Sequence, residues 1–271
     1  MSAARVPLDE LWVCHLGLIP YADGLAIQGQ LRDRRQEGAV PDTLLLLEHP
    51  PTYTRGRRSG ASDLPMPESF YRARGIEVHT TDRGGKLTYH GPGQLVGYPI
   101  MAVTDIGRYL RTMERAIVDA LAEVGVRARS RHREGIDYTG VWVEDRKIAS
   151  IGVHVSRGVT THGFAVNVEN DLEPFSWVVA CGLPDVQMTS LACLSSAVEG
   201  APRGALESAG ACESLSCFRK RVAHSFARAH GRRQRLVSAA RLGIAATDAH
   251  ARAERAPIKS SPAPTAEPAL L

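Results

Sequence analysis

Residues 140–168, GVWVEDRKIASIGVHVSRGVTTHGFAVNV, hold three apolar segments that are separated by links of only two and three residues. The segments 140–144, 147–155 and 159–168 are rich in β-branched residues, which is typical of β-strands. Links this short suffice only for hairpin turns, and a hairpin joins antiparallel strands. This stretch therefore predicts an α+β protein with a mixed sheet rather than a doubly wound parallel fold.

Apolar runs and helical periodicity extend this prediction to the rest of the chain. The further strands that apolar runs predict lie at 11–16, 43–48, 76–81 and 95–100. The amphipathic helices that a spacing of three or four residues predicts lie at 21–37, 107–124 and 214–230. The predicted fold class is thus α+β, with a mixed, largely antiparallel sheet flanked by helices.

One domain is expected to span residues 1–235. Within it, the segment at about 195–213 is rich in Ala, Gly and Ser, so we expect a small surface insertion there. Residues 236–271 are rich in Ala, Pro, Ser and Arg, and they end in SSPAPTAEPALL. Such a composition buries too little apolar surface to fold, so these residues are expected to form a disordered C-terminal tail.

The composition argues against several classes of protein. Of the 271 residues, 44% are hydrophobic and 23% are charged, which is ordinary for a soluble globular protein. The sequence has no apolar run of 18 residues and no secretory signal, so we expect a cytoplasmic protein without a membrane partner. Residues 1–193 carry 21 basic and 23 acidic side chains, a balance that argues against nucleic acid as a partner.

The cysteines do not form a recognisable framework. They are five in number and contain no C-x-x-C pair: Cys14, Cys181, Cys193, Cys212 and Cys217. An odd number without paired spacing argues against a set of disulfides and against a zinc site, so no metal is expected. Each thiol is therefore either a small buried hydrophobe or a reactive group.

The segment 83–94, RGGKLTYHGPGQ, has four glycines and a proline among donor side chains. Glycines permit unusual backbone angles and let a ligand approach the main chain closely. The spacing matches neither the G-x-x-x-x-G-K-[ST] nor the G-x-G-x-x-G nucleotide motif. Composition alone leaves two interpretations open, a ligand-binding loop and an elaborate turn.

Three further residues have both a structural and a functional interpretation. Lys147 opens a strand beside a tight turn, where a lysine is usually solvated, and alternation would place it on one face with Ala149 and Ile151. Cys181 precedes Gly182 and Pro184, so the thiol either lies on an exposed turn or packs as a small apolar group. His162, inside an apolar strand, is either a core histidine or the site of a bulge.

Taken together, three segments resemble one family, the lipoyl(octanoyl) transferases. They are RGGKLTYHGPGQLVGYPI (83–100), residues 140–168 quoted above, and LEPFSWVVACGLPDVQMTSL (172–191). The likeness spans about residues 10–193 and implies a fold similar to the catalytic domain of biotin and lipoate protein ligases. It also implies transfer of an octanoyl group from acyl carrier protein to a lysine of lipoyl domains or of the glycine-cleavage H protein. The resemblance implies no cofactor, neither ATP nor a metal.

The same resemblance implies roles for individual residues. Cys181 would be the nucleophile that forms an acyl thioester, and Lys147 would be its catalytic partner. The residues that would bind substrate are Arg83, Gly84, Gly85, Lys86, Leu87, Thr88, Tyr89, His90, Ser150, Ile151, Gly152, Gly163, Phe164 and Ala165. His162 would help to shape the site, without a catalytic role.

These residue types suit the chemistry. A free cysteine is mostly protonated at neutral pH, and a neighbouring ammonium group favours the reactive thiolate. A lysine that has lost its proton can in turn accept one from an attacking amine. Basic clusters at 55–58 and at Arg127, Arg129, Arg131 and Arg133 are candidates for steering acidic partner proteins, and alternation would place the latter four on one strand face.

Three rival functions remain open at this stage. An ATP-dependent lipoate or biotin protein ligase shares the expected fold but would not need Cys181. A thioesterase would pass the acyl group to water. A non-catalytic acyl-group or nucleic-acid binding protein would use neither Cys181 nor Lys147 for chemistry.

Overall fold

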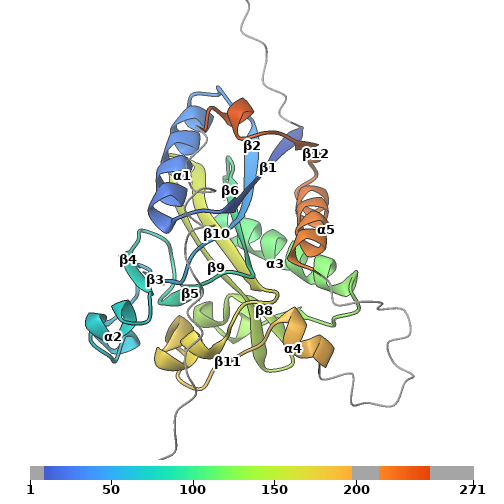
Figure 1. Cartoon of the computed structure of the whole chain (residues 1–271). Coiled ribbons are helices and arrows are strands. Elements are labelled where there is room, and N and C mark those ends of the chain that lie inside the picture. Colours follow the sequence, from blue (N-terminus) through green and yellow to red (C-terminus); the bar gives the residue numbers. More distant parts are fainter. Residues whose placement is uncertain (1–8, 197–213, 245–271) are drawn as a thin grey trace, which may run out of the picture.

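A mixed sheet runs through the centre of the protein, as the computed structural model shows for residues 9–196 and 214–244 (Figure 1). The spatial order of its strands is β12-β1-β2-β6-β10-β9-β8-β7, and β11 pairs with β9. Their bounds are β1 Glu10–Leu18, β2 Asp42–Glu48, β6 Gln94–Ile100, β7 Arg129–Ser130, β8 Gly140–Val143, β9 Arg146–Ser156, β10 Val159–Asn167, β11 Gln187–Met188 and β12 Arg233–Leu236. The pairs of β1 with β2 and β12, and of β11 with β9, are parallel, whereas all others along the strand order are antiparallel. The predicted α+β class is confirmed.

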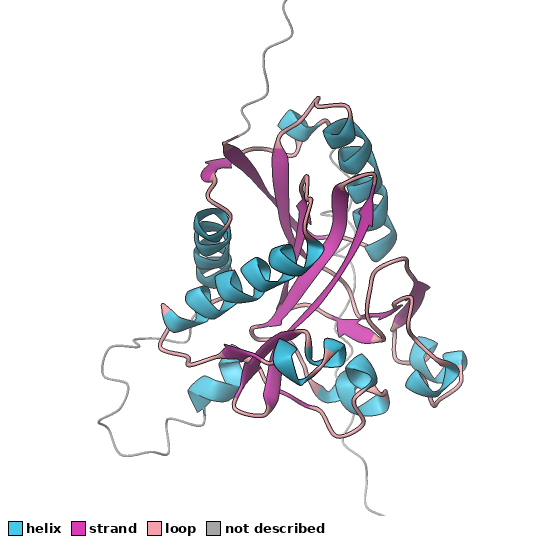
Figure 2. Cartoon of the chain, turned by 180° about the vertical axis from the view of Figure 1, so that it is seen from behind, coloured by secondary structure: helices cyan, strands magenta, loops and turns pink. Residues whose placement is uncertain are grey.

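Helices cover both faces of this sheet (Figures 1 and 2). Their bounds are α1 Tyr21–Gln36, α2 Glu68–Arg72, α3 Ile106–Ala122, α4 Leu191–Ser196 and α5 Leu215–Ala229. The apolar run of β2 explains the two layers, because successive side chains point to opposite faces. Leu44 and Leu46 pack with α3 and α5, whereas Leu45 and Leu47 pack with α1. A strand that is buried on both faces has this continuous apolar sequence.

A second, smaller sheet supports the segment that contains Cys181. Its strands are β3 (Thr52–Arg55), β4 (Glu77–Thr80) and β5 (Thr88–His90), in the order β4-β3-β5. A separate apolar cluster lies against it and includes Tyr53, Tyr89, Phe175 and Ala180. Since Ala180 directly precedes Cys181, this cluster anchors the chain on the N-terminal side of the thiol.

The structured part extends beyond the expected boundary at residue 235. Strand β12 pairs with β1, and Leu242 and Ile244 are buried in the same apolar cluster as Trp12. Residues 236–244 therefore pack against the domain rather than forming part of a tail. The remaining tail residues, 245–271, and nearly all of the expected insertion, 197–213, lie outside the described residues.

The expected arginine face on residues 127–133 is not formed. Strand β7 comprises only Arg129 and Ser130, and a 3-10 turn follows at His132–Glu134. The side chain of Arg131 lies over the ring of Trp142 at 4.6 Å and forms an ion pair with Glu134. Arg129 and Arg131 both lie 3.5 Å from the Oδ1 of Asp145, so these two side chains do converge, but the strand that would align all four arginines on one face is not formed.

Candidate active site

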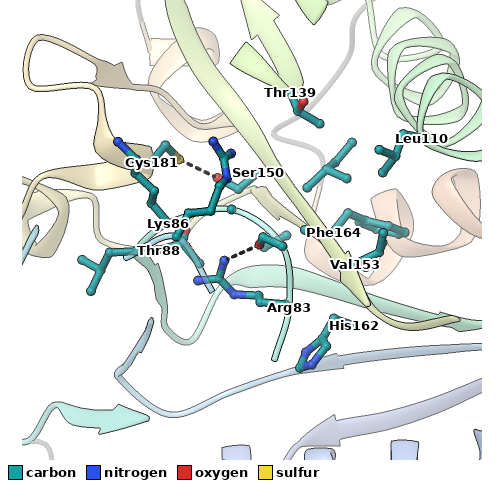
Figure 3. A pocket seen from close by; sticks show the side chains of 18 of the residues that line it. Arg83, Lys86, Thr88, Leu110, Thr139, Ser150, Val153, His162, Phe164 and Cys181 are labelled. Carbon is teal, nitrogen blue, oxygen red and sulfur yellow. Dashed lines mark hydrogen bonds between the residues drawn. The ribbon is translucent and has the colours of Figure 1, made fainter. Parts of the chain in front are cut away.

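A cavity of about 490 Å³ lies where the 83–90 segment meets β9, β10 and the turn at Cys181 (Figure 3). Pockets of this size are typical of small-ligand sites. The side chains of Cys181, Ser150, Lys86 and Thr88 lie toward one side of it, whereas Leu110, Val153 and Phe164 lie toward the other (Figure 3). The cavity therefore combines a polar end that contains a thiol with an apolar arm.

Cys181 lies on a 3-10 turn, Ala180–Gly182, with a left-handed backbone conformation of φ 56° and ψ 10°. A non-glycine residue seldom adopts positive φ, and such conformations concentrate at functional sites. Its backbone N–H donates to the carbonyl oxygen of Leu87 at 2.8 Å, which ties the turn to the 83–90 segment. The thiol is half-buried and lines the cavity. The alternative of a packed structural cysteine is thereby disfavoured.

Lys147 is buried, with 2% of its surface exposed, which rules out the alternative of a solvated surface lysine. Its Nζ lies 3.2 Å from the Sγ of Cys181, and 5.2 Å from the ring centre of Trp142. Gly140 makes room for the side chain, because a Cβ atom at that position would come within 2.8 Å of the Cε of Lys147. Throughout residues 9–196 and 214–244, Lys147 forms no ion pair with a carboxylate.

A β-bulge in β9 brings Ser150 to the same sulfur atom. Val141 pairs with Ala149 and Trp142 pairs with Lys147, so Ile148 is an extra residue in β9. The Oγ of Ser150 consequently lies 3.7 Å from Sγ, three positions beyond Lys147. The prediction that Lys147 shares a face with Ala149 is wrong, because Ala149 belongs to the apolar core.

Arg83 connects the glycine-rich loop to strand β3. It is buried, and its guanidinium donates to the carbonyl oxygen of Thr54 at 2.6 Å and to that of Gly84 at 3.1 Å. Burial lowers the pKa of Arg83, although a guanidinium remains charged in proteins. The loop also lies directly on β9, since Gly84 N–H donates to Val153 at 2.9 Å and a Cβ on Gly152 would come within 2.7 Å of the Gly84 oxygen.

Histidines near the polar end are held neutral by burial. Burial lowers the pKa of His90 well below its usual value, and its Nδ1 lies 2.8 Å from the Oε1 of Gln94. His162 has φ 58° and donates from Nε2 to the Oδ1 of Asp82 at 2.7 Å, and burial lowers its pKa despite that carboxylate. Neither imidazole forms a hydrogen bond with the thiol among the described residues. They shape the cavity wall instead.

The structure places nearly all of the expected site residues at this cavity. Besides Cys181 and Lys147, the lining includes Arg83, Gly84, Gly85, Lys86, Leu87, Thr88, His90, Ser150, Ile151, Gly152, His162, Gly163, Phe164 and Ala165. Tyr89 is the exception. Its ring faces the cluster of the small sheet, 5.5 Å from the ring centres of Tyr53 and Phe175. Tyr89 therefore supports the site from behind rather than lining it.

Sequence patterns did not indicate several other lining residues. Tyr21 begins α1, and Tyr98 in β6 donates its hydroxyl to His49 at 2.7 Å. The apolar arm is completed by Ile106 and Leu110 from the start of α3 and by Ile136. Of these, Tyr98 lies within the 83–100 segment that resembled the family, which was the available signal. The others come from elements far apart in the sequence.

The mouth of the cavity is mainly basic. Arg57 and Arg58 are exposed there, and Arg58 forms an ion pair with Asp137 at 2.8 Å. Asp137 is the single acidic residue in the lining that the described chain provides. The charge at the mouth therefore favours anionic ligands or acidic partners.

In the ranges 9–196 and 214–244, no group of three or more His, Cys, Asp or Glu side chains is arranged to hold a metal ion. None of the helices in these ranges has the length and apolar character needed to cross a bilayer.

Comparison with known proteins defines the class. Residues 20–199 match the lipoyl protein ligase A/B catalytic domain, so the chain belongs to that family. Lipoate-protein ligase A bound with ATP shares the fold with a TM-score of 0.66 at 18% identity, covering 84% of this chain and 89% of that one. An archaeal lipoate protein ligase from Thermoplasma acidophilum aligns with a TM-score of 0.63 at 18% identity, over 84% and 87% of the two chains.

Proteins that are similar in sequence indicate which group within this family the chain resembles. The octanoyltransferase of Acidobacterium capsulatum is 46% identical over 194 residues, which cover 65% of this chain and 77% of that protein. The mitochondrial octanoyltransferase LIP2 of Arabidopsis thaliana is 43% identical over 186 residues, covering 67% and 77%. The protein is therefore an acyltransferase of the octanoyltransferase group, which acts in protein lipoylation.

Proposed function

We propose that the protein transfers an octanoyl group from octanoyl-acyl carrier protein to a lysine of a lipoyl domain or of glycine-cleavage H protein, through a thioester on Cys181. One observation carries the proposal: the ammonium nitrogen of Lys147 lies 3.2 Å from the sulfur, inside a cavity with an apolar arm. An acyl chain fits the apolar arm, and the nucleophile lies at the polar end.

In the first half-reaction the sulfur of Cys181 attacks the carbonyl carbon of the donor thioester. The buried ammonium of Lys147 stabilises the thiolate that this attack requires, because an opposite charge in contact favours the charged form. A new C–S bond forms and the bond to the donor sulfur breaks. Lys147 gives its proton to the departing thiolate and becomes a neutral amine.

In the second half-reaction the acceptor lysine attacks the acyl group on Cys181. Its ammonium group first loses one proton to solvent, because only the neutral amine is a nucleophile. The neutral Lys147 is placed to accept the second proton, which the nitrogen releases as the amide forms. The C–S bond breaks, the amide forms, and Cys181 and Lys147 return to the thiolate and ammonium. This is a ping-pong reaction in which one lysine serves both halves.

No ATP or metal enters this scheme. The donor is already a thioester, so activation of a carboxylate as an adenylate is unnecessary. The lipoate-protein ligase bound with ATP shares the fold with this chain at 18% identity, which is a likeness of fold and not of chemistry.

The partners are proposed from charge and from the proteins that share the fold. Arg57 and Arg58 lie at the mouth, and acyl carrier proteins and lipoyl domains are generally acidic. The Thermoplasma acidophilum ligase was described together with its E2 lipoyl domain. A reactive free thiol also requires a reducing compartment, and the cytoplasm meets that need.

One incubation tests the proposal against its rivals. The protein is mixed with octanoyl-acyl carrier protein and an unmodified lipoyl domain without ATP, and intact masses are recorded. We expect the lipoyl domain to gain one octanoyl group, with a transient octanoyl adduct on Cys181. Free octanoate as the main product would indicate a thioesterase, and a requirement for ATP would indicate a ligase. Transfer at the normal rate by Cys181→Ala would contradict the thioester intermediate.

A further inference from the structure

Ser150 places a hydroxyl beside the nucleophile, and its hydrogen bond to the sulfur is long. Its side chain is half-buried in β9 and points toward Cys181 (Figure 3). The Oγ lies 3.7 Å from Sγ, and it forms no other hydrogen bond within the described parts of the chain. A hydroxyl normally finds a better partner when it is partly removed from water. The geometry therefore points to a partner that arrives with the substrate.

The position of this hydroxyl suits the oxygen of an acyl group on the sulfur. The distance of 3.7 Å is long for a contact with the thiolate, for which Lys147 is closer at 3.2 Å. The carbonyl oxygen of an acyl group bonded to Sγ is two bonds away from the sulfur. A donor just outside the first contact shell of the sulfur is thus within reach of that oxygen.

The β-bulge in β9 explains why the hydroxyl of Ser150 lies beside the sulfur of Cys181. In a regular strand, residues three apart point to opposite faces. The extra residue, Ile148, brings Lys147 and Ser150 to the same atom, while the backbone of Ser150 stays paired with Ala165 in β10. Bulges often occur beside active sites, where they redirect a side chain.

We propose that Ser150 is a catalytic residue whose hydroxyl donates a hydrogen bond to the oxyanion in both half-reactions. The inference rests on the proposed thioester chemistry at Cys181. When the thiolate attacks, the C–S bond forms and the electron pair of the C=O double bond moves onto oxygen. The O–H of Ser150 stabilises that charge without transferring its proton. Collapse restores the C=O bond and expels the donor thiolate or, in the second half, the thiolate of Cys181.

The first test distinguishes stabilisation of the oxyanion by Ser150 from stabilisation of the Cys181 thiolate. Ser150→Ala and wild-type protein are compared in single-turnover acylation by a small octanoyl thioester, followed by intact mass. Loss of one oxyanion donor slows acylation by about 100-fold to 1,000-fold. The pH profile for alkylation of Cys181 by iodoacetamide should be unchanged, because Lys147 remains. Ser150→Thr, which keeps the hydroxyl, should recover most of the rate.

The second test uses a mimic of the tetrahedral state. Octanal adds to the thiolate to give a hemithioacetal, in which the former carbonyl oxygen occupies the oxyanion position. We expect Ser150→Ala to weaken inhibition by octanal and to leave inhibition by octan-1-ol unchanged. Weakening of both would indicate a general change in the cavity and would overturn the assignment.

The outcomes distinguish this inference from the proposed function. If wild-type protein acquires no octanoyl adduct on Cys181, the proposed function fails and the role of Ser150 fails with it. If wild-type protein is acylated and Ser150→Ala is acylated equally fast, only the inference about Ser150 fails. A parallel shift in the alkylation profile of Ser150→Ala would also overturn it, because Ser150 would then act on the thiolate.

Discussion

The Nζ of Lys147 and the Sγ of Cys181 are 3.2 Å apart although the residues are separated by 34 positions in the chain. Lys147 is buried beside the ring of Trp142 and has no carboxylate partner in the residues that the structure describes. Burying a charge without a partner is costly. In the proposed thioester mechanism, the thiolate of Cys181 supplies that partner, 3.2 Å from Nζ.

Replacing Lys147 by Met should remove most of the activity. The variant keeps the apolar stem of the side chain but lacks both the ammonium and the base, and loss of general acid–base catalysis costs about 100-fold to 10,000-fold. Steady-state transfer to a lipoyl domain measures the loss, and alkylation of Cys181 at pH 7 should be slower. Unchanged alkylation would contradict a charge interaction at the sulfur.

Gly140 is expected to control the position of Lys147. It has φ 137°, and a Cβ there would collide with the Ala149 oxygen and approach the Cε of Lys147 to 2.8 Å. Gly140→Ala should therefore reduce the rate of acylation as well as the stability. Gly135→Ala is the matched control, because Gly135 has φ 131° but its nearest neighbour would be Tyr138 at 3.9 Å.

The two glycine variants share the backbone strain, which costs on the order of 1–3 kcal/mol. Thermal unfolding should therefore show a loss of stability in both, larger for Gly140→Ala. Acylation by a small thioester, measured well below the unfolding temperature, should fall only in Gly140→Ala. An equal fall in both variants would mean that the position of Lys147 does not depend on Gly140.

Acid should destabilise the protein through its buried histidines. Burial lowers the pKa of His49 to about 4 from a usual value near 6.5, and it also lowers the pKa of His90 and His162. Between pH 6.5 and about 4 the unfolded chain binds more protons than the folded protein, so stability falls as the pH falls. Each fully shifted histidine contributes about 1.4 kcal/mol per pH unit in that window.

Urea unfolding at pH 7.5 and at pH 5 measures this dependence. His49→Gln should lower the stability at pH 7.5, because His49 bonds to Ile19 and Tyr98, but it should reduce the difference between the two pH values. His224→Gln, at an exposed position, is the control and should behave as wild type. An unchanged pH dependence in His49→Gln would contradict the assignment.

The segment after β12 should contribute to stability. Leu242 is 1% exposed and lies in the apolar cluster with Trp12 and Leu31, whereas Leu236 is 65% exposed. Leu242→Ala should reduce the free energy of unfolding by about 2–5 kcal/mol, as is usual for buried leucines. Leu236→Ala, the same chemical change on the surface, should stay within about 0.5 kcal/mol of wild type. Equal effects of the two substitutions in urea unfolding would contradict the burial of Leu242.

The sequence alone determined the fold class and the segments from which the site is built. The apolar, β-branched segments of 140–168 and their short links specify antiparallel hairpins because both are local properties of the chain. The resemblance of the 83–100 and 172–191 segments placed the thiol and the glycine-rich loop in one site, and both line the cavity. Local patterns and long motifs were sufficient for these predictions.

Only the tertiary structure decided how the side chains point. Alternation predicted that Lys147 shares a face with Ala149, but the bulge at Ile148 brings Lys147 and Ser150 to Cys181 instead. Tyr89 turns toward the small sheet, and Leu242 and Ile244 pack beyond the expected boundary. A bulge changes which face every later residue occupies, and burial depends on elements distant in the chain. The local sequence pattern encodes neither the position of the bulge nor the burial of these side chains. The bulge results from the pairing of strands, and burial results from the packing of the core.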